Sequence, residues 1–221
     1  MSFLILFLSV FLGVLIVYLL KPKLHFTQLL LSFSGAYLLA ITITHLLPEA
    51  FIESNKNVGL FIILGLLIQL IMDYFSKGAE HGHIHHHGNK FPAILFGSLC
   101  LHAFMEGIPL AHDEHQELLW AIVVHKLPIT IVLGSFLAHS NTTLIKSLFL
   151  LLVFALMSPL GSLIGGNVAF LITYKTEITA VVIGIFLHIS TIIIFESAEN
   201  HKFNFAKFIA ILLGFGVALV I

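Results

Sequence analysis

The sequence predicts an all-α membrane protein with eight transmembrane helices, and three observations support this fold class. Of its 221 residues 59% are hydrophobic and only 10% are charged, whereas soluble domains are about 45–50% apolar and about 25% charged. Apolar stretches of about 18–22 residues, long enough to cross about 30 Å of hydrocarbon, recur along the whole chain. The connections are short, except for residues 76–90. We therefore expect a single integral membrane domain over residues 1–221.

The apolar stretches define the expected helices in chain order. The first, MSFLILFLSVFLGVLIVYLLKP, lacks a charged n-region and an obvious cleavage site, so we interpret it as a retained helix rather than a signal peptide. The sixth contains Gly161 and Gly166 near its end, which leave its length open. Short connections predict antiparallel neighbours. The expected spans are residues 2–20, 26–51, 58–75, 91–111, 118–138, 144–166, 177–196 and 203–221.

Lysine carries the whole topology signal, because the chain contains no arginine. Only Lys56 and Lys175 flank the even-to-odd connections, and Lys126 falls within a span. The positive-inside rule then places both termini outside and the 76–90 loop in the cytoplasm. We expect a multi-pass protein of the inner or plasma membrane of the cell. The lysines that flank odd-to-even connections are Lys21, Lys23, Lys77, Lys90, Lys146, Lys202 and Lys207.

Composition also excludes several partners. The net charge of -1 and the lack of a basic patch argue against nucleic acid. The single cysteine, Cys100, excludes an intramolecular disulfide and a multi-cysteine metal site. We therefore expect the lipid bilayer as the main surroundings and no resident cofactor.

Ionisable residues recur inside the predicted spans, where they are rare and usually face a bundle interior, a partner or a water path. The fourth span contains His102 and Glu106, and the fifth contains His125 and Lys126 just before Pro128. A proline can free a carbonyl where a cavity is lined. The second and seventh spans add His45, Glu49, His188 and Glu196.

His102 and Glu106 have the spacing of metal ligands on one helix. Residues at i and i+4 lie on the same face about 6 Å apart, so both side chains can reach one cation. His125 lies at a similar depth when about 1.5 Å per residue is counted from the outer end of its span. Imidazole and carboxylate suit Zn²⁺, Fe²⁺ or Mn²⁺ better than Ca²⁺ or Mg²⁺. A buried structural hydrogen bond is the alternative explanation of each His–Glu pair.

Two connections carry further candidates for cation capture. The 76–90 loop contains a cluster of imidazoles that can bind transition metals weakly. The connection from His112 to Glu117 is acidic and can concentrate cations at the outer mouth, although a solvated turn explains it equally well. The clustered histidines of the loop are His81, His83, His85, His86 and His87.

Four sequence motifs resemble those of the ZIP (Zrt/Irt-like) divalent-metal transporters. They are "HLLPEA" in the second span, "HAFMEG" in the fourth, "HKLPIT" in the fifth and "SPLGSLIGG" in the sixth. The resemblance implies a ZIP-like bundle of eight helices with both termini outside and a His-rich cytoplasmic loop. It also implies that His102 and Glu106 match the first metal site on the fourth helix, and that His125 opens the motif of the fifth.

The chain departs from the family pattern at several ligand positions. Ala103 stands where the family often has Asn, Lys126 where it often has Glu or Asp, and Ile129 replaces a second acidic residue. Ser158 takes a position where some members place another carboxylate. We hypothesise that the ammonium of Lys126 substitutes for the second metal ion near Glu106; the alternative is that Lys126 extends to the outer interface.

We therefore expect a transporter that moves a divalent transition metal, zinc in the first place with Fe²⁺ or Mn²⁺ as alternatives, into the cytoplasm. The ion would rest on His102, Glu106 and His125, and one group of helices would move against another. A membrane-embedded metal enzyme acting on lipid and a non-transporting metal sensor are the competing functions. Whether the chain forms a homodimer stays open. Beyond the site, the expected path continues through His45, Glu49, His188, Glu196, Glu199 and His201.

Overall fold

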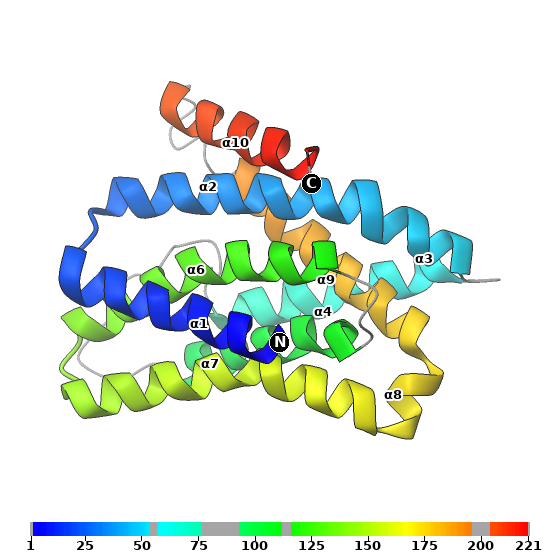
Figure 1. The fold of residues 1–221 in the computed structure, drawn as a ribbon, viewed down its shortest axis with the longest axis horizontal. Helices are drawn as coiled ribbons and strands as arrows, with labels where there is room; N and C mark the ends of the chain where they lie inside the picture. Colours follow the sequence, from blue (N-terminus) through cyan, green and yellow to red (C-terminus); the bar gives the residue numbers. More distant parts are fainter. Residues whose placement is uncertain (1, 54–56, 77–92, 112–115, 196–203, 221) are drawn as a thin grey trace.

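A computed structural model describes residues 2–53, 57–76, 93–111, 116–195 and 204–220, and these ranges consist of helices and short links without any strand. The helices pack side by side in one bundle (Figure 1). The predicted all-α fold is confirmed. The helices are α1 (Ser2–Leu15), α2 (Leu24–Ile41), α3 (Leu47–Glu53), α4 (Val58–Ser76), α5 (Ala93–Gly107), α6 (Gln116–His139), α7 (Leu144–Asn167), α8 (Ala169–Thr173), α9 (Lys175–Phe195) and α10 (Phe205–Ala218).

Within the described ranges, seven helical segments are long and apolar enough to cross a membrane, and α10 is a shorter apolar helix at the position of the eighth expected span. The side chain of Asn204 begins α10 by accepting hydrogen bonds from the backbone N–H groups of Ala206 and Lys207. Large apolar side chains face outward, such as Ile52 and Ile145, which are 84% and 83% exposed. A lipid environment explains this exposure, because a water-soluble protein would bury much of it.

Two local features differ from the sequence prediction, and one point that the sequence left open is answered. α1 continues through a π-helical turn, Ile16–Leu20, and a second such turn, Thr42–Leu46, joins α2 to α3 within one long span. The short helix α8 lies between the sixth and seventh spans. The glycines near the end of the sixth span do not shorten it, because α7 stays helical to Asn167.

Close contacts between backbones hold several helix pairs together. A Cβ atom at Gly107 of α5 would overlap the carbonyl oxygen of Ser158 in α7, and one at Gly161 of α7 would overlap that of Phe104 in α5. α4 and α9 are equally close: a Cβ atom at Gly65 would overlap the carbonyl oxygen of Val181, and one at Gly184 that of Ile62. Small residues permit such an approach in membrane bundles, where dispersion contacts rather than water drive helix association.

The buried apolar residues form two clusters. The smaller cluster comes entirely from α1, α5, α6 and α7, and includes Leu99, Leu133 and Phe154. The larger cluster comes mainly from α2, α4, α9 and the first half of α6. α10 packs along α2 on this side of the bundle (Figure 1). α6 contributes to both clusters. We call α1, α5, α6 and α7, which form the smaller cluster, the first helix group, and α2, α3, α4, α9 and α10 the second.

Candidate metal centre

His102 and Glu106 lie on the buried face of α5, in the first helix group. Their side chains are 1% and 2% exposed, and His102 Nε2 lies 3.5 Å from Glu106 Oε2. The i, i+4 spacing explains this contact, since each turn of α-helix brings such residues over one another. An imidazole and a carboxylate thus share one buried position, as the sequence motif suggested.

His125 of α6 faces His102 across the interface between two helices. The centroids of the two imidazole rings are 6.1 Å apart and their planes are nearly perpendicular, at 84°. His125 is fully buried, and Pro128 lies within the same helix. Because proline has no N–H, the carbonyl of Val124, four residues before it, lacks its usual helical partner. The structure therefore adds a second imidazole to the His102–Glu106 pair.

The spacing of these side chains is wider than that of a formed metal site. In the described part of the chain, no group of three or more His, Cys, Asp or Glu side chains lies close enough to hold one ion. Zinc takes imidazole nitrogens at about 2.0–2.1 Å. His125 would therefore have to approach His102 and Glu106 for the three to share an ion.

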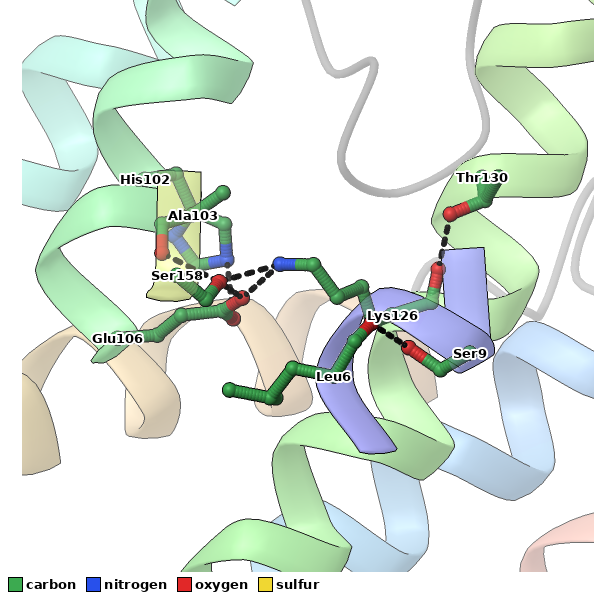
Figure 2. A network of polar contacts seen from close by, with 8 residues as sticks. All are labelled: Leu6, Ser9, His102, Ala103, Glu106, Lys126, Thr130 and Ser158. Atoms are coloured by element: carbon green, nitrogen blue, oxygen red, sulfur yellow. Dashed lines mark hydrogen bonds and ion pairs between the residues drawn. The ribbon is translucent and has the colours of Figure 1, made fainter. Parts of the chain in front are cut away.

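Lys126 points into the bundle rather than towards the interface. Its side chain is 1% exposed, and Nζ donates hydrogen bonds to Glu106 Oε1 at 2.6 Å and to Ser158 Oγ (Figure 2). The ammonium also lies 4.9 Å from the centroid of the Phe154 ring, a cation–π distance. The alternative position at the outer interface is thus excluded, and Lys126 occupies the neighbourhood of Glu106 that the sequence hypothesis gave it.

Ser158 of α7 completes the surroundings of this ion pair. Its hydroxyl oxygen accepts from Lys126 and lies 2.8 Å from Glu106 Oε1 and 2.6 Å from the carbonyl oxygen of Ala103. A hydroxyl has one proton, so it donates to one of these two oxygens at a time. Ala103 thus contributes its backbone, where the family pattern often has an Asn side chain, while Ile129 is buried in the smaller apolar cluster.

A second polar group joins α4 to α9, and the sequence analysis found only one of its members. His188 Nε2 lies 4.0 Å from Asp73 Oδ2, and Gln69 lies one turn before Asp73. Gln69 is fully buried, and neither its amide oxygen nor its amide nitrogen has a hydrogen-bond partner among the described residues. The signal for Gln69 and Asp73 was their i, i+4 spacing at the end of the third apolar stretch.

Two other residues predicted on the path, His45 and Glu49, lie at the end of the second span. His45 accompanies Thr44 in the π-helical turn, with Nδ1 2.7 Å from the threonine hydroxyl, and Glu49 follows in α3. This end of the bundle lies where α4 begins, whereas Asp73 lies near the end of α4, about 20 Å away along the helix. His45 and Glu49 therefore lie towards the end of the bundle opposite to Asp73 and His188, and their place on the ion path stays a prediction.

Several predicted residues lie outside the described ranges. They include the acidic connection at 112–115 and the candidates beyond α9. The full set of predicted site residues outside the described ranges is Glu196, Glu199, His201, His81, His83, His85, His86 and His87.

Comparison with known proteins agrees with the geometry. A family model described as ZIP Zinc transporter matches residues 91–221, more than half of the chain and the part that carries α5 to α10. Protein zntD of Dictyostelium discoideum is 29% identical over 169 residues, which cover 65% of this chain and 25% of that protein. The chain thus spans about a quarter of the length of this relative. The motifs, the apolar helices and the family match together show that this multi-pass membrane protein belongs to the ZIP zinc transporter family.

Proposed function

We propose that this protein carries a divalent transition metal, zinc in the first place, across the membrane into the cytoplasm. The observation that carries the proposal is the burial of His102, Glu106 and His125 together inside a bundle of apolar helices. Two imidazoles and one carboxylate offer the borderline ligands that Zn²⁺ and its neighbours prefer. A water molecule as fourth ligand would leave the site open for release.

The wide spacing of the three ligands fits a transient binding site for a transported ion rather than a permanent structural metal site. A transported ion must bind well enough to lose part of its hydration and weakly enough to leave again. In the proposed cycle, the ion first contacts His102 and Glu106, which already lie 3.5 Å apart, and His125 then closes on it. Lys126 stands where the family pattern has an acidic ligand, so one ion is held instead of two.

The release path runs past Asp73 and His188, along the C-terminal halves of α4 and α9, in this proposal. Asp73 and His188 offer a carboxylate and an imidazole at the C-terminal ends of these helices, the ends that the lysine distribution places in the cytoplasm. Gln69 supports a hydrated path beside them, because a buried amide without hydrogen bonds is costly unless water or an ion reaches it. His45 and Glu49, at the opposite end, would then serve entry.

Uptake of ⁶⁵Zn²⁺ into proteoliposomes tests the proposed function. We expect uptake by the unmodified protein and its near-complete loss in His102→Ala and Glu106→Ala. Leu101→Ala is the matched control, because Leu101 lies on the same helix but is 49% exposed on the lipid side. Uptake that survives in both variants would show that the transport site lies at other residues. Metal binding without flux in the unmodified protein would point to a sensor.

A further inference from the structure

Lys126 has a feature that transport by His102, Glu106 and His125 does not by itself require. It is a fully buried cation with a complete set of partners: the carboxylate of Glu106, the hydroxyl of Ser158 and the face of the Phe154 ring. Figure 2 shows the lysine reaching from α6 towards Glu106 and Ser158. A charge at such a depth is costly unless it is paired, so the arrangement points to a purpose in the transport cycle.

The ion pair sets the net charge of the empty site. Glu106 and Lys126 are 2.6 Å apart and together carry no net charge, whichever atom holds the shared proton. Lys126 thus places a counter-charge directly on the carboxylate of Glu106 in the empty centre, and its removal would leave that carboxylate without one.

The two oxygens of Glu106 face different partners. Oε1 accepts from Lys126 and lies beside Ser158, while Oε2 lies on the side of His102. A metal ion can therefore bind Oε2 and His102 while the ammonium keeps Oε1. Binding of the metal does not require Lys126 to leave.

We propose that Lys126 is the built-in counter-cation of the empty transporter, which neutralises Glu106 so that the metal-free site can return across the membrane. This inference rests on the proposed transport function. Once the ion has left, a lone carboxylate would have to be moved through a low-dielectric region. The tethered ammonium removes this obstacle in every cycle without being transported itself.

Two flux assays in proteoliposomes at pH 7.5 separate this role from metal binding. Net uptake of ⁶⁵Zn²⁺ into vesicles without internal metal requires the empty site to return. Exchange of external ⁶⁵Zn²⁺ against saturating internal unlabelled Zn²⁺ does not, because the site is loaded in both directions. For Lys126→Met we expect exchange to stay within a fewfold of the unmodified protein and net uptake to fall on the order of 100-fold.

Three further variants control the experiment. Lys126→Arg keeps the charge and should restore net uptake, whereas Lys207→Met removes a buried lysine of α10 and should leave the ratio of the two fluxes unchanged. If Lys126→Met shows neither exchange nor a folded elution profile, Lys126→Gln takes its place, because its amide can still donate to Glu106 and Ser158 without a charge.

The outcomes distinguish the inference from the proposed function. Selective loss of net uptake supports the counter-cation. An equal loss of net uptake and exchange in a folded variant overturns it, and so does the retention of both. Absence of uptake and exchange in the unmodified protein would instead overturn the proposed function, and the inference with it.

Discussion

At the scale of single residues, the centre is a set of small departures from a metal-binding pattern. Glu106 shares one oxygen with Lys126 and Ser158 and turns the other towards His102. A carboxylate at the position of Lys126 would repel the carboxylate of Glu106 unless a second cation lay between them. The substitution by lysine and the presence of a serine at 158 therefore belong together: one supplies the cation and the other a hydroxyl that accepts from it.

Replacing Lys126 should change the number of ions bound. In Lys126→Glu two carboxylates would face each other near Ser158, and their repulsion is relieved when a second divalent ion bridges them. We expect two Zn²⁺ per chain in this variant and one in the unmodified protein, measured by elemental analysis after equilibrium dialysis with the loop histidines replaced in both. An unchanged count would show that Lys126 does not stand in for an ion.

Gln69 offers a test in which stability and transport should change in opposite directions. Its buried amide lacks a hydrogen-bond partner among the described residues, so Gln69→Leu should raise the free energy of unfolding by about 1–3 kcal/mol. If the amide is wetted by the release path, the same change should lower zinc flux severalfold. Thermal unfolding in detergent and ⁶⁵Zn²⁺ uptake measure the two effects. Lower stability together with unchanged flux would contradict the assignment.

The residues of the centre could be predicted from sequence because they interrupt apolar stretches. His102, Glu106, His125 and Lys126 are conspicuous where a charge is costly. Ser158 was identified by its place in a motif, but its contacts depend on how α7 packs against α5. Asp73 was overlooked because it lies close to the end of its span, where a charged residue can equally well face water.

At the scale of helices, the apolar length of each stretch predicted its position within a few residues, because the thickness of the membrane sets that length. The π-helical turns and α8 were not predictable in this way, since they depend on local backbone hydrogen bonding. The end of α7 is instructive. Its glycines left the length of the span open, and Gly161 and Gly165 stay helical where α7 lies directly against the chain from Phe104 to Ile108.

Two glycines of α5 should respond in opposite ways to the same substitution. A methyl group at Gly107 would overlap the Ser158 carbonyl, so Gly107→Ala should lower the free energy of unfolding by about 1–3 kcal/mol. Gly97 has no atom within 4 Å of the corresponding position, and Gly97→Ala should raise it by up to about 1 kcal/mol. Thermal unfolding in one detergent compares the two. Equal effects would mean that α5 and α7 are not in backbone contact.

At the scale of the whole molecule, the bundle has two apolar clusters rather than one. His102, Glu106, His125, Lys126 and Ser158 all belong to the first helix group, whereas Asp73 and His188 belong to the second. The sequence did not predict this division, because helices that are apolar all round do not indicate which neighbour each one contacts. The division matters for transport, since a site carried by one group can change its access when that group moves against the other.

Locking the two helix groups together should therefore stop transport reversibly. Met72 of α4 and Ser98 of α5 meet across the division, where the Ser98 hydroxyl donates to the Met72 carbonyl at 2.9 Å. With Cys100→Ala as background, Met72→Cys and Ser98→Cys joined by a short bis-methanethiosulfonate, which forms a disulfide with each thiol, should abolish ⁶⁵Zn²⁺ uptake, and reduction of these disulfides should restore it. The matched control joins Val17→Cys to Gly134→Cys within the first group, where the Cβ separation of 3.6 Å suits a disulfide. That link should leave uptake intact, because α1 and α6 belong to the same helix group. Full uptake with the Met72–Ser98 positions linked would mean that the ion passes without relative motion of the two helix groups. Loss of uptake with either link would mean that the first helix group itself must change shape during transport.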